Sequence, residues 1–210
     1  MGQYGKALDL LGRRHFHVWE GGGDIHDVYI NAHLLEGRQH FAAKRYKQAL
    51  DDYAAALQFP ENLEVGRPEH PPRDGEIYFH LGTAYEALGD NAQAKAHFEK
   101  AASEKIDLPE ARYFQGLALR KLGQEARATL VFEGLIKSGR QELDATSDSD
   151  YFAKFGERRA ETVRIAHGRY LMGLGYLVQG RRAEAKVEFE KVLGQNINHL
   201  WARVELASLR

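Results

Sequence analysis

With 210 residues, of which 43% are hydrophobic, the chain can bury a core as one domain or one array of repeats. Its 29 Lys and Arg residues are balanced by 30 Asp and Glu residues, which leaves no excess positive charge for a phosphate backbone and disfavours nucleic acid as a partner. The absence of cysteine excludes disulfides and thiolate sites, and no apolar run reaches the roughly 18 residues of a membrane span, so a cytoplasmic protein with no membrane contact is expected.

The first predicted element is a helix within residues 1–11, with the sequence QYGKALDLL. Its Ala7 matches Ala49 of the next copy of an internal pattern, so we interpret it as the second helix of a partial repeat without its first helix. Such a helix is expected to expose apolar surface and to favour a homodimer through the terminal helices. An insertion over 12–27 follows, in which Trp19 stands beside three consecutive glycines in the phrase HVWEGGGD.

Four copies of one pattern come next, over about 28–60, 75–108, 109–138 and 157–195. Matching places in the second and third copies are 34 residues apart, and they hold small residues, aromatic residues and a turn glycine. The matched residues are Gly37, Ala49, Tyr53, Ala56 and Pro60; Leu81, Gly82, Tyr85, Gly89, Ala94 and Phe98; Gly116, Gly123, Ala128 and Phe132; and Gly173, Tyr176, Gly180, Ala185 and Phe189. Small residues let two helices approach while rings fill the space beside them, so each copy predicts a packed helical hairpin.

The stretch YFHLGTAYEALGDNAQAKAHFEKA, Tyr78 to Ala101, resembles the tetratricopeptide repeat (TPR) consensus almost position for position. The resemblance implies an all-α fold, a right-handed α-α superhelix (TPR solenoid) of about four hairpins, with partial repeats over 1–11 and 197–210 in a single array over 1–210. Helices are predicted over about 75–127, with turns at Gly89–Asp90, Lys105–Leu108 and Gly123–Gln124.

Three insertions, over 12–27, 60–74 and 138–156, interrupt the period between one copy and the next. The second holds four of the five prolines and cannot be helical throughout, and the third contains the polar run DATSDSD before a long helix near Glu157. Because all three follow the second helix of a copy, we expect them along one edge of the array, and solenoids commonly bind through such a face. We therefore predict partner contacts from Trp19, Glu20, Asn62 and Arg67, although Trp19 could equally fold back on a neighbouring hairpin.

A second candidate surface is the concave groove, which the family lines with positions five and nine of each first helix. Position five is Leu34, Phe79, Tyr113 and Tyr170, and position nine is Arg38, Thr83, Leu117 and Leu174. This set lacks the lysine, asparagine and arginine with which related domains clamp chaperone tails. The resemblance implies partner contacts from Arg38, Phe79, Tyr113 and Tyr170, with packing between repeats as the equal alternative.

No motif predicts chemistry. His26, His33 and His40 recur every seven residues, which separates them by roughly 10 Å along a helix, too far for one metal ion. His15 and His17, near Glu20, Asp24 and His26, could converge in a folded loop, but they match no known ligand spacing. The three glycines lack the context of a phosphate loop, and Asp144, Asp148 and Asp150 are expected in solvent. We predict no catalytic residue, no metal and no cofactor.

The sequence favours an interaction or scaffolding module that is not an enzyme and binds a protein segment or its own N-terminal domains. The phrases WEGGG and PENLEVGRP also resemble segments in the C-terminal TPR half of large bacterial proteins whose N-terminal half is carbohydrate-related and mutarotase-like. That resemblance implies the alternative: an accessory segment of a carbohydrate-active enzyme, with the catalytic domain N-terminal to this chain and a carbohydrate as a further ligand.

Overall fold

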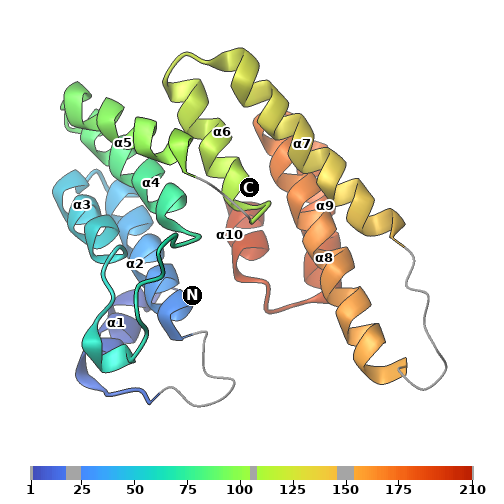
Figure 1. The fold of residues 1–210 in the computed structure, drawn as a ribbon, viewed down its shortest axis with the longest axis horizontal. Helices are drawn as coiled ribbons and strands as arrows, with labels where there is room; N and C mark the ends of the chain where they lie inside the picture. The colour runs from blue at the N-terminus through green and yellow to red at the C-terminus, as the bar shows by residue number, and fades with distance from the viewer. Residues whose placement is uncertain (1, 18–24, 105–107, 146–153, 210) are drawn as a thin grey trace. The chain divides into compact units, whose positions relative to one another are not determined.

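The structure, a computed structural model, describes residues 2–17, 25–104, 108–145 and 154–209, and over 154–160 the backbone alone. Every regular element in these ranges is a helix, as the predicted all-α fold requires (Figure 1). The elements are α1 (Tyr4–Arg13), α2 (Ile25–Ala42), α3 (Tyr46–Ala55), the 3-10 turn η1 (Glu61–Leu63), α4 (Asp74–Ala87), α5 (Asn91–Ser103), α6 (Ala111–Lys121), α7 (Glu125–Asp144), α8 (Lys154–Val178), α9 (Arg182–Gln195) and α10 (Leu200–Ser208). Within the described ranges, no helix has both the length and the hydropathy that crossing a bilayer demands.

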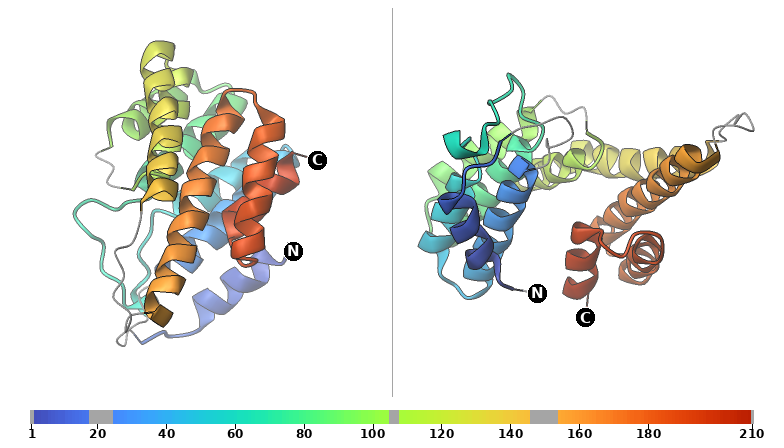
Figure 2. Two further views of the ribbon diagram at one scale, coloured as in Figure 1. Left: turned by 90° about the vertical axis from the view of Figure 1, so that its right-hand side faces the viewer. Right: turned by 90° about the horizontal axis from the view of Figure 1, so that it is seen from below.

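The helices form two compact units, and α6 contributes residues to each. Unit 1 comprises Met1–Asp107 and Leu117–Gly123, and unit 2 comprises Leu108–Gly116 and Gln124–Arg210. In unit 1, α1 packs on α2, α2 on α3, α3 on α4 and α4 on α5. In unit 2, α7 packs on α8, α8 on α9 and α9 on α10, as the views in Figure 2 also show. The helices named here each pack on a neighbour in the chain, and the predicted hairpins α2–α3, α4–α5 and α8–α9 are among these pairs.

A contact between a glycine and an aromatic ring recurs in all four predicted copies. A Cβ atom built on Gly82 of α4 would lie 2.6 Å from Cε1 of Phe98 on α5, which is closer than real Cβ contacts. The same contact joins Gly37 to Tyr53, Gly116 to Phe132 and Gly173 to Phe189, at 2.4, 2.3 and 2.5 Å. The alanines at the matching small places are at most 3% exposed; they are Ala49, Ala94, Ala128 and Ala185. The predicted packing role of these small and aromatic residues is confirmed.

The turn inside each hairpin needs one residue with a left-handed backbone, seven positions after the glycine that meets the ring. Gly89 has φ +82°, and Gly123 and Gly180 have φ +74°. In the first hairpin that place belongs to Lys44, which adopts φ +60° without the freedom of glycine. The predicted turns at 89–90 and 123–124 are confirmed, whereas most of the predicted turn at 105–108 lies outside the described residues.

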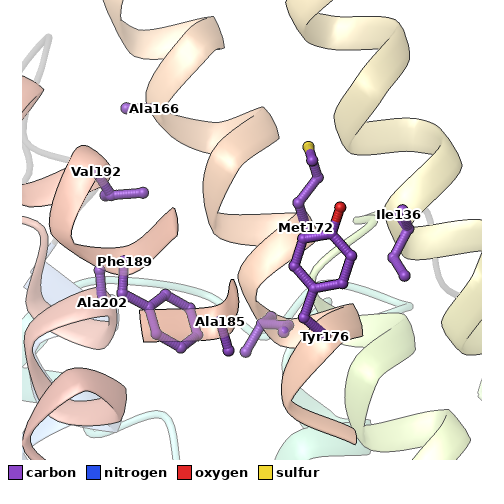
Figure 3. Packing of buried hydrophobic residues seen from close by; sticks show 9 residues of the cluster. Ile136, Ala166, Met172, Tyr176, Ala185, Phe189, Val192 and Ala202 are labelled. Carbon is purple, nitrogen blue, oxygen red and sulfur yellow. The ribbon is translucent and has the colours of Figure 1, made fainter. Parts of the chain in front are cut away.

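The first helix, α1, is partly covered by its neighbours and partly exposed. Leu11 of α1 is only 5% exposed and packs with Ala32 of α2 and with Leu63 of η1, because the second insertion brings Leu63 back to this helix. Its neighbour Leu10 remains 50% exposed. At the other end of the chain, Ala202 of α10 is buried in the core of unit 2 (Figure 3).

The insertion predicted over 138–156 begins inside a helix, since α7 continues to Asp144 before α8 starts at Lys154. A Cβ atom on Gly139 would lie 2.4 Å from the carbonyl oxygen of Gly168, so the backbones of α7 and α8 approach closely here. Leu143 packs against the core of unit 2, in which Met172 and Tyr176 lie beside Ile136 (Figure 3). Burial of this apolar face explains why the helix persists beyond the repeat.

Candidate binding surface

The aromatic residues predicted to line the groove are half-buried and packed within their own units. In unit 1, the ring of Phe79 lies 5.8 Å from that of Phe98 and packs against the cluster around Ala94. In unit 2, the ring of Tyr170 lies 6.0 Å from that of Phe189 and 4.7 Å from that of His199. Tyr113 packs against the same core. These contacts give the three aromatic residues a packing role, whatever else they bind.

Two further groove positions, Leu34 and Arg38, lie within unit 1 and are at least half-buried. Leu34 has no exposed surface, and Arg38 is half-buried on the same helix. Burial, with the charges of Arg38 and Arg73, lowers the pKa of His80 to about 3, so this imidazole is neutral at ordinary pH. His80 also stacks on Tyr53, with ring centroids 5.1 Å apart. The neutral His80 ring is thus part of the packed interior next to Arg38.

The second insertion is fixed to the rest of unit 1 by a clasp at Asn62. The side-chain amide of Asn62 donates hydrogen bonds to the carbonyl oxygens of Leu11 and Arg14, both at 2.7 Å. In return, the backbone N–H of Phe16 donates to the carbonyl oxygen of Asn62 at 2.7 Å. Next to the clasp, Leu63 is 1% exposed. The first and second insertions are thus joined directly, although the sequence separates them by about one repeat.

Arg67 fixes the middle of the same insertion. Its guanidinium donates to the carbonyl oxygen of Leu57 at 2.8 Å, forms an ion pair with Asp74, and lies 5.2 Å from the ring centroid of Phe59. Burial raises the pKa of Asp74, and the adjacent Arg67 opposes that rise. The positive charge thus holds a buried carboxylate at the start of α4.

Arg73 fixes the end of the insertion against α2. It donates to both the Glu76 carboxylate, at 2.8 and 3.0 Å, and the side-chain oxygen of Asn31, at 2.8 Å. Asp27 lies 3.9 Å from it and remains 60% exposed. The inserted segment therefore has three polar anchors along its length, at Asn62, Arg67 and Arg73.

Between these anchors and α2 the insertion encloses a pocket of about 210 Å³. Its apolar lining consists of Ile30, Ala56, Phe59, Val65, Pro68, Pro71 and Pro72. Asp27 and Arg73 lie at its polar side. Four of the lining residues that the sequence did not single out, Val65 and the three prolines, come from the proline-rich phrase that marked the insertion.

The predicted edge residues have different outcomes. Asn62 and Arg67 anchor the insertion that forms the pocket, and both donate hydrogen bonds to backbone carbonyl oxygens of unit 1. Trp19 and Glu20 lie outside the described residues. Sequence reasoning missed Glu64, which follows η1 and meets His15 and His17 from the first insertion. Because Glu64 is 49 and 47 residues from these histidines in the sequence, no local motif could have predicted the contact. Among the described residues, this group is the one whose side chains could hold a metal ion.

Comparison with known proteins gives one family match and several structural likenesses. The chain is similar to PilF of Pseudomonas aeruginosa at 17% identity, over 88% of this chain and 68% of that one, with a TM-score of 0.36. It is also similar to MamA of Desulfovibrio magneticus RS-1, at 18% identity over 86% and 83% with a TM-score of 0.29, and to YrrB, a TPR protein with an unusual peptide-binding site, at 18% identity over 95% of each chain with a TM-score of 0.32. The tetratricopeptide repeat model matches residues 75–105. The α4–α5 hairpin, which spans nearly all of that match, is therefore a tetratricopeptide repeat.

Proposed function

We propose that this chain is a protein-interaction module with no chemistry of its own, and that the pocket at the second insertion receives a side chain of a protein partner. The observation that carries the proposal is the anchoring of the insertion. An insertion that served only to connect two helices would not need polar anchors at Asn62, Arg67 and Arg73. Held in this way, its apolar pocket is available without a large loss of conformational entropy.

The size of the pocket favours a side chain over a small molecule. At about 210 Å³ it is smaller than the roughly 300–1,000 Å³ of sites for drug-sized ligands. Three of its lining residues are prolines, which lack a backbone N–H, so the lining is poorly suited to pairing with a β-strand of the partner. An apolar side chain on a protein segment therefore fits the site best, with the exposed Asp27 suited to a basic neighbour in that segment.

A display selection of random peptides on the purified chain tests this proposal. Gly66 lines the pocket, and a Cβ atom there meets nothing within 4 Å, so Gly66→Leu adds an apolar side chain at the pocket from an open position. We expect Gly66→Leu to weaken peptides selected on the wild type by about tenfold or more. Gly134→Leu, an equally open position on α7, is the matched control and should bind normally.

Tyr113→Ala distinguishes this surface from the groove. Loss of peptide binding in Tyr113→Ala, with normal binding in Gly66→Leu, would assign recognition to the groove instead. Trp19 remains a predicted contact residue, and peptide binding by Trp19→Ala is measured alongside these variants. Failure to select any peptide that binds the wild type would count against the interaction role itself.

The chain's own N-terminal domains are an alternative source of the bound segment. The accessory role in a carbohydrate-active enzyme rests on the resemblance of WEGGG and PENLEVGRP. Phe59 is a poor platform for a sugar ring, since His26 already stacks on it with ring centroids 3.8 Å apart and Arg67 lies nearby. A protein ligand is thus the better match to this pocket.

A further inference from the structure

Two histidines of the first insertion converge on one carboxylate of the second, on a part of unit 1 that faces solvent. Nε2 of His15 lies 2.6 Å from Oε1 of Glu64, and Nδ1 of His17 lies 3.2 Å from the same oxygen. The two imidazole centroids are 4.6 Å apart. The side chains are 52%, 80% and 37% exposed for His15, His17 and Glu64, so an ion could reach them.

The backbone holds the three groups together from both sides. Between the two histidines, Phe16 is tied by its N–H to Asn62 and packs against the cluster of Leu11, Ala32 and Leu63. Glu64 directly follows the buried Leu63 and adopts φ +53°, a left-handed conformation that is unfavourable for a glutamate. The Asn62 clasp thus holds the backbone positions that carry the three side chains close together.

The donor set selects the kind of ion. Two imidazole nitrogens and one carboxylate oxygen are ligands of zinc-class cations, and zinc sites with two histidines and one glutamate leave a fourth position open. Calcium and magnesium prefer shells made mainly of oxygen, which this set does not supply. The three ligand atoms all lie within 4.8 Å of one another, whereas a tetrahedral zinc site needs about 3.3 Å between them. To reach that spacing, the 2.6 Å contact between His15 and Glu64 has to lengthen and any separation wider than about 3.3 Å has to shorten.

We propose that His15, His17 and Glu64 form a binding site for a divalent transition cation of the zinc class. The ion clips the first insertion to the second and leaves a coordination position for water or for a group from a partner. This site is separate from the peptide pocket, because none of its three ligands lines that pocket. Either proposal can therefore fail without the other.

Titration of the tag-free chain with Zn²⁺ by calorimetry tests the site, and the absorption of bound Co²⁺ reports on its geometry. We expect one Zn²⁺ per wild-type chain and a tetrahedral Co²⁺ spectrum. Glu64→Gln keeps a hydrogen-bonding partner for the histidines but removes the charged ligand, and His15→Gln removes a nitrogen ligand. Each should weaken Zn²⁺ binding by more than the roughly 10–100-fold that the loss of an outer-shell partner costs.

Two variants control for general effects of charge and of histidine. Glu61→Gln makes the same change on an exposed residue of η1, and His97→Gln replaces a histidine of α5; both should bind Zn²⁺ like the wild type. Melting curves without metal check that the variants fold. Absence of binding in the wild type would overturn the proposal, as would binding by Glu64→Gln that equals the wild type or an equal loss in Glu61→Gln.

Discussion

At the scale of single residues, the contact between glycine and ring is the feature that most tightly constrains the sequence. Gly82→Ala would place a methyl group 2.6 Å from Phe98, and we expect it to lower the free energy of unfolding by about 1–3 kcal/mol through overpacking. Urea unfolding measures the loss. Gly134→Ala is the control, because its methyl group meets no atom within 4 Å and should raise the stability by about 0.5–1 kcal/mol. Equal stability of Gly82→Ala and the wild type would contradict the packing role.

His167 is expected to make the stability of unit 2 dependent on pH. Its hydrogen bond to Glu110 at 3.0 Å, opposed by burial and aided by Glu142 at 2.8 Å, raises the pKa of His167 to about 9. Because the folded pKa exceeds the unfolded value near 6.5, the stabilisation is complete below about pH 6.5 and disappears as the pH rises through about 9. A shift of this size corresponds to about 3 kcal/mol, and solvent screening at Glu110, which is 39% exposed, reduces our expectation to about 1–2 kcal/mol.

Unfolding of His167→Gln across this pH range gives the measurement. The variant should be less stable than the wild type by about 1–2 kcal/mol near pH 6 and should match it near pH 10. A difference that stays constant with pH would show that His167 acts through packing and not through its charge.

At the scale of elements, the first hairpin turns at a residue that is poorly suited to the turn. Lys44 occupies the left-handed position that glycine fills in the other three hairpins, and Lys44→Gly should stabilise the chain by about 0.5–1 kcal/mol. The same substitution at the exposed Lys47, inside α3, should destabilise it by about 1 kcal/mol. Thermal or urea unfolding of both variants tests the pair, and a loss of stability in Lys44→Gly would contradict it.

The sequence predicted the hairpins well because their signals are local. Small residues, rings and turn glycines recur at fixed spacings, and the turns at 89–90 and 123–124 follow from them. The extension of α7 to Asp144 was not predicted, since it depends on the close approach of Gly139 to Gly168 and on burial of Leu143 by another helix. Such contacts arise between distant residues and leave no period in the sequence.

At the scale of the whole molecule, the candidate sites were only partly predictable. The excess of prolines and the broken period indicated that the second insertion is special, and the pocket lies there. The internal roles of Asn62 and Arg67 were not visible, because each binds a backbone carbonyl that no side-chain pattern encodes. The meeting of Glu64 with His15 and His17 was not visible either, because it joins side chains 49 and 47 residues apart in the sequence.

Self-association is the prediction that concerns the terminal helices. Leu10 of α1 is 50% exposed and Ile197, before α10, is 71% exposed, so both apolar side chains are available to a second copy. We expect sedimentation velocity to show a dimer at high concentration, and Leu10→Gln to shift the equilibrium toward monomer. Arg13→Gln, on the same helix, serves as a control for changes in polarity. A strict monomer at all concentrations would contradict this prediction.

The Asn62 clasp has a consequence for the order in which the chain folds. Its hydrogen bonds join residues 48 and 51 positions apart, whereas the ring contact of the first hairpin joins Gly37 to Tyr53. Closing the longer loop costs more chain entropy, so the clasp should form after the rate-limiting step. Asn62→Ala is then expected to accelerate unfolding and to leave the refolding rate nearly unchanged, which stopped-flow kinetics can measure. Slower refolding with an unchanged unfolding rate would instead place the clasp in the folding nucleus.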